Sequence, residues 1–158
     1  ELAIKNFRGA HRRFEILGEK NGVLVIDDYG HHPTEIKSVL AGVKEKYPDK
    51  KIFAIFWPHQ YKRTKALLPK FKDAFKLADE MIVKEIFFVP GRDKKLDISG
   101  RDIVDLINED DGDRAKFIDD DQEIINYLEE KLTSNYVLVT IGIPPVYKIA
   151  KSYLGEKC

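Results

Sequence analysis

The sequence predicts an α/β fold: a Rossmann-like three-layer sandwich around a mostly parallel sheet of about six strands, with one antiparallel edge strand. Short apolar runs rich in Val, Ile and Phe alternate with segments whose apolar residues recur at helical spacing. The runs are continuously apolar, which is typical of strands covered on both faces. A chain of 158 residues is long enough for one such domain, so residues 1–158 are expected to form a single unit.

The expected elements follow one another along the whole chain. Strands near residues 13–17 and 23–26 flank Asn21-Gly22, a dipeptide typical of two-residue hairpin turns, so these strands are expected to pair antiparallel. Further strands are expected at residues 52–56, 81–86, 115–118 and 136–142, and helices at 34–47, 64–77, 99–107, 121–132 and 144–153, with Pro69 as a kink or break. Right-handed crossovers would bring the carboxyl ends of the parallel strands to one edge of the sheet.

The most informative stretch is the junction between the second strand and the first helix. The strand ends at Asp27-Asp28, and the loop Tyr29-Gly30-His31-His32 leads into Pro33-Thr34-Glu35. Pro33 suits the first position of a helix, and Glu35 stands where its carboxylate can reach back to the amide of His32. The start of a helix explains these later residues but does not require the carboxylates and histidines. Since binding sites lie at the carboxyl ends of parallel strands, we expect a binding or catalytic loop here.

A second polar loop follows the strand at residues 52–56 and reads Trp57-Pro58-His59-Gln60-Tyr61-Lys62-Arg63-Thr64. Arg63 stands near the start of a helix, where backbone N–H groups and a guanidinium together make a receptor for a carboxylate or phosphate. Lys62 by itself fits a solvated surface residue. The loop at residues 89–92 and Gly142 are expected at the same edge of the sheet.

Several function classes are disfavoured by composition and missing motifs. Lys and Arg number 27 and Asp and Glu also 27, so the formal net charge is +0 and no global field attracts nucleic acid or an anionic membrane. No Gly-x-Gly-x-x-Gly or Gly-Lys-Ser/Thr motif occurs, so the chain is not a self-sufficient P-loop enzyme. A Gly-x-Ser-x-Gly elbow is also missing, which disfavours a serine hydrolase.

Cysteine use and the two ends of the chain suggest a compartment. Cys158 is the only cysteine, so neither an internal disulfide nor a cysteine-based zinc site is expected, and a cytoplasmic location is the natural interpretation. No apolar run is long enough to span a bilayer, and residues 1–5 show no signal-peptide pattern. The first residue is Glu1 instead of Met, which suggests a fragment of a longer chain.

The same two loops contain residue types that can bind a metal ion. Asp27, Asp28, His31, His32 and His59 are ligand types that suit zinc or iron. No tight His-x-x-x-His or Glu-x-x-His spacing supports such a site, so no metal ligand is assigned.

Three motifs together carry a resemblance to a known family. They are Phe7-x-Gly9-x-x-Arg12-Arg13-Phe14, the run from Asp27 to Ile36, and Pro58-His59-x-Tyr61-x-Arg63-Thr64. In these motifs the chain resembles the Mur ligases of peptidoglycan synthesis, and most closely the C-terminal domain of the branch that joins L-alanine to UDP-N-acetylmuramate. The second motif is highly specific, while the region after Ile118 adds little beyond the fold pattern.

The resemblance implies a function for a longer protein with three domains: an N-terminal UDP-sugar domain, a central ATPase and this C-terminal domain. ATP phosphorylates the sugar carboxylate, and the amine of L-alanine attacks the acyl phosphate. Such a ligase serves cell wall biogenesis, cell shape and cell division, and its ATP and Mg²⁺ are held mainly by the central domain. The resemblance implies ATP contacts for Arg13 (phosphates) and Asp28 (ribose), and an amino-acid pocket lined by Tyr29, His31, His59 and Arg63. No catalytic residue is assigned.

Two departures from the family pattern leave alternatives open. Gln60 stands where the alanine-adding branch usually has Arg, and Gly142-Ile143-Pro144-Pro145 replaces a Gly-Ala-Gly-like turn. A related muropeptide-recycling ligase is therefore an alternative, as are a non-catalytic domain that binds small anions and a stand-alone metal hydrolase. No feature of the sequence assigns an oligomeric state.

Overall fold

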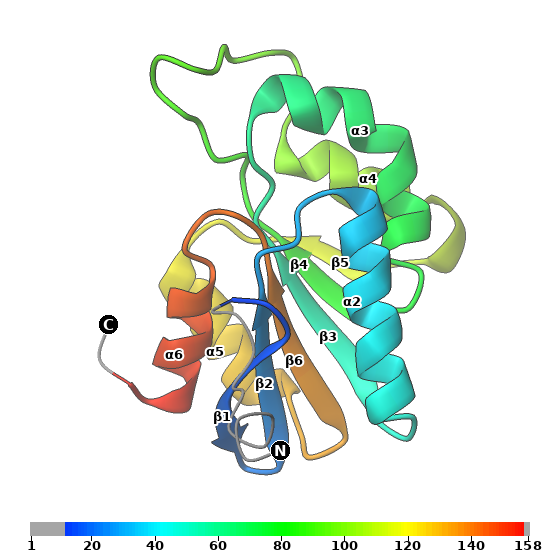
Figure 1. Cartoon of the computed structure of the whole chain (residues 1–158), viewed down its shortest axis with the longest axis vertical. Coiled ribbons are helices and arrows are strands. Elements are labelled where there is room, and N and C mark those ends of the chain that lie inside the picture. The colour runs from blue at the N-terminus through cyan, green and yellow to red at the C-terminus, as the bar shows by residue number, and fades with distance from the viewer. Residues whose placement is uncertain (1–11, 157–158) are drawn as a thin grey trace, which may run out of the picture.

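The computed structural model describes residues 12–156, which form three layers around a single six-stranded sheet (Figure 1). The strands are β1 (Glu15–Lys20), β2 (Val23–Asp28), β3 (Lys51–Phe56), β4 (Glu80–Val83), β5 (Ala115–Phe117) and β6 (Tyr136–Ile141). The helices are α2 (Pro33–Lys46), α3 (Tyr61–Ala74), α4 (Gly100–Asp111), α5 (Asp121–Lys131) and α6 (Tyr147–Leu154). The strand order is β1-β2-β6-β3-β4-β5, with β1 antiparallel to β2 and the other neighbours parallel, so the predicted fold class is confirmed. Phe7, Gly9 and Cys158 lie outside the described residues.

Both faces of the sheet are covered, which explains the continuously apolar strands. Helices α2, α3 and α4 pack on one face and α5 and α6 on the other (Figure 1). Within β2, Ile26 joins the core under the first group of helices, whereas Val23 and Val25 join the core under the second. This alternation follows from the pleat, which points successive side chains to opposite faces.

The hairpin at the edge of the sheet confirms the Asn-Gly prediction. Asn21 and Gly22 have φ angles of 51° and 80°, as a two-residue turn matched to the twist of the strands requires. The first strand begins at Glu15 and not at residue 13. Arg12 and Phe14 have φ angles of 56° and 44°, which are incompatible with an extended strand.

Other details also differ from the predicted elements. Strand β4 ends at Val83, and Ile86 packs with Tyr61 in a small cluster of its own, outside the sheet. Pro69 lies inside α3 without ending it. Helix α6 begins at residue 147 because the N–H of Val146 donates to the carbonyl of Pro144 (2.6 Å), which closes a tight turn first. No helix in the described part of the chain has the length and apolar character needed to cross a membrane.

The carboxyl ends of the parallel strands meet at one edge, as predicted. Ile141 pairs in register with both Asp28 and Phe56, and Phe56 pairs with Val83. The loops that begin at residues 29, 57, 84 and 142 therefore start side by side. This edge is where the polar residues selected from the sequence are brought together.

Candidate functional site

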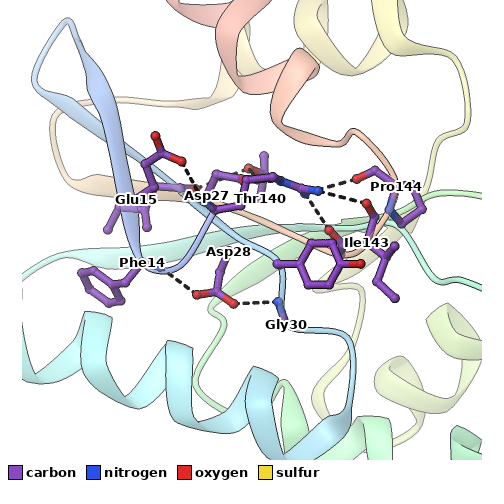
Figure 2. A network of polar contacts seen from close by, with 12 residues as sticks. Phe14, Glu15, Asp27, Asp28, Gly30, Thr140, Ile143 and Pro144 are labelled. Carbon is purple, nitrogen blue, oxygen red and sulfur yellow. Dashed lines mark hydrogen bonds and ion pairs between the residues drawn. The ribbon is translucent and has the colours of Figure 1, made fainter. Parts of the chain in front are cut away.

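The two carboxylates at the end of β2 point to opposite faces of the sheet and have different partners (Figure 2). Asp27 is fully buried; its Oδ1 accepts from the hydroxyl of Thr140 (2.7 Å) and its Oδ2 from Nε of Arg12 (2.8 Å). Asp28 accepts from two backbone amides, those of Phe14 (2.8 Å) and Gly30 (2.6 Å). Each carboxylate therefore has a structural task at the start of the loop.

Arg12 joins three segments that are distant in sequence. Its guanidinium donates to the carbonyl groups of Gly142 (2.6 Å), Ile143 (2.9 Å) and Pro144 (3.2 Å) in the turn after β6 (Figure 2). The guanidinium carbon lies 5.3 Å from the ring centroid of Tyr29 and 4.9 Å from that of Tyr147. The guanidinium therefore makes cation–π contacts with its faces in addition to the hydrogen bonds from its N–H groups. Burial raises the pKa of the Asp27 carboxyl above its ordinary value, although the hydrogen bonds from Arg12 and Thr140 oppose the rise.

Two glycines at this edge are required by close approaches. A Cβ on Gly142, whose φ is 141°, would lie 2.7 Å from the carbonyl oxygen of Trp57. A Cβ on Gly30 would lie 2.8 Å from Oδ1 of Asp28 and would disturb the hydrogen bond that holds the loop. Gly142, which opens the turn after β6, thus serves a packing need, because no side chain fits there.

Arg13 is exposed between two residues in the left-handed region, a conformation that costs roughly 1–2 kcal/mol per residue. It makes no hydrogen bond to Asp28 within the described part of the chain; the backbone of the next residue, Phe14, makes that contact. The predicted capping bond is confirmed, since Glu35 accepts from the amides of His31 and His32 (both 3.1 Å). These two bonds lower the pKa of Glu35, and the charges of His31 and Arg13 add to the effect.

His59 is held in place by a short parallel bridge to the loop after β4. The amide of Phe87 donates to the carbonyl of Pro58 (2.8 Å), and the amide of Gln60 donates to the carbonyl of Phe87 (3.1 Å). The His59 ring stacks on the Phe87 ring, with centroids 6.2 Å apart and planes 17° apart. Its Nδ1 is buried and has no hydrogen-bond partner among the described residues.

The electrostatics of His59 show which charges surround it. Burial lowers its pKa below the ordinary 6.5, and the positive charges of Arg63 and His31 lower it further, against a smaller opposing effect of Asp93. His59 is therefore neutral at pH 7. The structure thus places both His31 and Arg63 within electrostatic range of His59, although they come from two loops.

The rest of the third motif, which runs from Pro58 to Thr64, divides between core and surface. Tyr61 and Thr64 are buried, whereas Lys62 and Arg63 are exposed. Helix α3 has no side-chain cap on its N-cap residue Gln60, and Oδ2 of Asp93 instead accepts from the amide of Tyr61 (3.0 Å). Beside this helix start, a cavity of about 480 Å³ is lined by Lys62, Gly91, Arg92, Asp93, Lys94 and Leu96.

Tyr29 connects the two groups of residues. Its ring packs on the Arg12 guanidinium and meets the His31 ring edge to face, with centroids 5.9 Å apart. His31 also lies near Glu35, with 3.7 Å between Nδ1 and Oε2. His32 is exposed and caps α2 by accepting from the amide of Thr34 (3.4 Å), so its task is structural. The described residues contain no group of three or more His, Cys, Asp or Glu side chains arranged to hold a metal ion.

Three contributors were missed from the sequence: Arg12, Phe87 and Asp93. In the sequence, Asp27 indicates that a partner such as Arg12 must exist, because a carboxylate inside a buried strand needs a cation or hydrogen-bond donors nearby. Asp93 and Phe87 lie in a long irregular loop after β4, where no periodicity indicates which side chain turns inward.

The fold and the site define a class of protein: an α/β domain that displays charged groups at the carboxyl ends of its parallel strands. The chain matches the family described as "Mur ligase, glutamate ligase domain" over residues 12–143 and therefore belongs to the Mur ligase family. It is 42% identical over 97% of its length to the UDP-N-acetylmuramate–L-alanine ligase of Caldanaerobacter subterraneus, and spans 33% of that relative. It spans about a third of the other curated relatives of this name as well.

Solved structures agree with this membership. The crystal structure of UDP-N-acetylmuramate-alanine ligase from Thermotoga maritima matches 98% of this chain with a TM-score of 0.78 and 28% identity, over 31% of that enzyme. A murein peptide ligase from Psychrobacter arcticus matches the same share with a TM-score of 0.76 and 24% identity, which shows a common fold.

Proposed function

We propose that this chain, residues 1–158, is the C-terminal domain of an ATP-dependent ligase that joins L-alanine to UDP-N-acetylmuramate in peptidoglycan synthesis. The observation that supports the proposal is that the loops after β2 and β3 start at the same edge of the sheet, with His31 and Arg63 both within electrostatic range of His59. Because the chain spans about a third of its relatives, the UDP-binding and central ATPase domains are assigned to the rest of the protein. Such a ligase would act in the cytoplasm and, through the cell wall, affect cell shape and division.

In the nucleotide half of the site, Arg13 contacts the phosphates of ATP and Asp28 the ribose. The exposed guanidinium of Arg13 fits a phosphate, which accepts charge-assisted hydrogen bonds. Asp28 is 5% exposed and already accepts two backbone N–H groups, but a carboxylate offers about four lone-pair sites, so a ribose hydroxyl can share it. Mg²⁺ and most phosphate contacts belong to the central domain.

In the amino-acid half, Arg63 binds the carboxylate of L-alanine, and Tyr29, His31 and His59 line the pocket. Arg63 makes no hydrogen bond or ion pair with any other described residue, so its planar fork is available for a carboxylate. The attacking amine must be neutral to form the amide. A neutral His59 can accept a hydrogen bond from that amine, and without a charge of its own it does not repel the nearby Arg63.

The identity of the amino acid is the second part of the proposal. Gln60 stands where the alanine-adding branch has Arg, and its backbone is already committed, with a φ of 65° and its amide bound to Phe87. The pocket therefore has one cation fewer than expected. Kinetics with L-alanine, other amino acids and a preformed muropeptide decide the matter; preference for the peptide would support the recycling ligase instead.

The proposal is tested by comparing the isolated chain with the full-length ligase that carries it. Ligation by positioning needs ATP, the acyl acceptor and the amine together, which one wall of a cleft does not provide. The isolated chain should fold, bind ATP or L-alanine no more tightly than about millimolar in calorimetry, and release no ADP with both substrates present. Micromolar binding or turnover by the isolated chain would contradict the proposal and favour a self-contained anion-binding protein or enzyme.

A further inference from the structure

The segment Arg12–Phe14 is anchored on both sides of Arg13. On one side, the amide of Arg12 donates to Oε2 of Glu15 (2.6 Å) and its carbonyl accepts from the amide of Tyr29 (2.7 Å). The guanidinium of Arg12 is held in addition by Asp27 and by the turn after β6 (Figure 2). Backbone and side chain of Arg12 are thus both committed.

On the other side, Phe14 is held through its amide and its ring. The amide donates to Oδ2 of Asp28 (2.8 Å), and the ring packs on α2, where a Cβ on Gly42 would lie 3.4 Å from Cε2 of Phe14. The ammonium of Lys46 lies 5.7 Å from the centroid of the same ring. Phe14 is therefore tied to the α2 face of the sheet.

The two anchors come from opposite faces of β2. Asp27 shares the face of Val25 and holds Arg12, while Asp28 shares the face of Ile26 and holds Phe14. The left-handed φ angles of Arg12 and Phe14 then turn the residue between them outward. Asp27 on one face of β2 and Asp28 on the other thus account together for the exposure of Arg13 at the edge of the sheet.

We infer that Arg12 and Asp27 are positioning residues for the nucleotide: with Asp28 they hold the backbone around Arg13 so that its guanidinium is presented in a set direction. The inference rests on the proposed function, in which Arg13 contacts the phosphates. Ordering a long side chain on binding costs entropy, and a fixed backbone removes part of that cost before ATP arrives. Asp27 and Arg12 touch no substrate; they act through Arg13.

The kinetic test uses the full-length ligase that carries this domain. Arg13→Ala should raise the KM for ATP about tenfold or more, since a charge-assisted contact is lost. Asp27→Asn and Arg12→Lys should each raise it several-fold and leave the KM for the amino acid unchanged. In the Arg13→Ala background, Asp27→Asn should have no further effect, because the group that it positions is gone.

A matched control separates positioning from loss of stability. Glu80→Gln makes the same carboxylate-to-amide change in an ion-paired residue at the opposite end of the sheet, and it should lower stability without changing the KM for ATP. An Asp27→Asn effect that persists in the Arg13→Ala background, or that Glu80→Gln reproduces, would overturn the inference while leaving the contact of Arg13 with ATP intact. A wild-type KM for ATP in Arg13→Ala would overturn the proposed contact itself.

A spectroscopic measurement tests the anchoring without any substrate. A nitroxide label on Arg13→Cys, in a chain whose single native Cys158 is changed to Ser, should report a more mobile label when Asp27→Asn is added. Glu80→Gln should leave the mobility of the label as it is. Unchanged mobility in Asp27→Asn would overturn the inference whatever the kinetics show.

Discussion

The two halves of the site are built in different ways. At the end of β2, the Arg12 guanidinium donates to one carboxylate and three carbonyl groups, and both oxygens of Asp27 are bonded. At the start of α3, Arg63 makes no hydrogen bond within the described residues, and Nδ1 of His59 is buried without a partner. In the proposed nucleotide half, the buried groups Arg12 and Asp27 therefore find their partners within the chain itself, whereas the proposed amino-acid half leaves the Arg63 guanidinium for a ligand to bind. Mutations of Arg12 and Asp27 should therefore change stability as well as ATP binding, whereas mutations of Arg63 should change binding alone.

Arg12→Ala should have the largest effect on stability. It would leave the fully buried Asp27 carboxylate without its cation and free three carbonyl groups, and breaking a buried pair by removing one partner costs about 3–5 kcal/mol. Urea denaturation of the chain measures the loss. Arg63→Ala is the matched control in the amino-acid half, with an expected change within about 0.5 kcal/mol. Equal losses in the two variants would show that the halves do not differ as described.

Arg63→Lys should have the largest effect on binding. A lysine keeps the charge but loses the planar fork that matches a carboxylate, so the KM for the amino acid should rise about tenfold in the full-length ligase, with little change for ATP. Stability should be unchanged. Lys65→Gln, which removes an exposed charge from the same helix, should change neither KM. If Arg63→Lys raised both KM values equally, a defect in domain closure would explain the data better.

At the opposite end of the sheet, hydrogen bonds and an ion pair form a network that includes none of the proposed site residues. The hydroxyl of Tyr136 donates to Oε1 of Glu80 (2.5 Å), whose other oxygen pairs with Lys131 (2.8 Å). Burial and the bond to Glu80 raise the pKa of Tyr136 to about 12. A group whose folded pKa lies above its unfolded value of 10.0 stabilises the fold below pH 10.0, and this contribution is lost as the pH rises towards 12.

Tyr136→Phe should therefore cost about 1 kcal/mol at pH 7 and abolish the loss of stability between pH 10 and 12. Glu80 acts at the acid end: burial raises its pKa, but the hydrogen bonds from Lys131 and Tyr136 outweigh this and lower it below 4.5. Its contribution is lost as the pH falls through that lowered pKa. Chemical denaturation across the pH range measures the loss of stability at both the acid and the alkaline end. An identical loss at the alkaline end in Tyr136→Phe and the wild type would exclude Tyr136 as its cause.

The fold was predictable because its signals are local. Continuous apolar strands, helical periodicity and Asn21-Gly22 each act over a few residues, and the register of the parallel strands then places their ends together. The boundaries that failed depend on distant contacts. Strand β4 ends early because the chain turns away after Val83, and a buried Lys84, whose ammonium pairs with Asp121 (2.7 Å), stands in the predicted strand.

The site was only partly predictable, because adjacent residues of the same type have different surroundings in the folded chain. Arg12 and Arg13 are adjacent and chemically identical, and only the left-handed backbone on either side decides which one pairs with Asp27 and which one is exposed. His31 and His32 divide in the same way: the first lies within electrostatic range of His59, and the second caps α2. The resemblance singled out Arg13 and His31, and the geometry shows what their neighbours Arg12 and His32 do instead.

Protonation of His59 should cause the smallest change in folding stability, and the pKa of His59 gives the sharpest test of the proposed amino-acid half. Its pKa should lie below 6.5 because burial against Phe87 and the charges of Arg63 and His31 all disfavour the cation. A histidine whose folded pKa is lowered stabilises the fold above pH 6.5, and that contribution is lost as the pH falls through the folded pKa. Titration of the ring signals by NMR measures the value directly.

Two variants should divide this shift between its causes. Phe87→Ala uncovers the ring and should move the pKa of His59 upward towards 6.5, because burial is the larger cause. Arg63→Gln removes one repelling charge and should move it in the same direction by less. Because Nδ1 has no partner in the described chain, the amino acid should also alter the ring signals when it binds to the full-length ligase, and Phe87→Ala should weaken that response. A pKa of 6.5 or above in the unmodified chain would mean that His59 is solvated, and the contrast between a completed nucleotide half and an open amino-acid half would then rest on Arg63 alone.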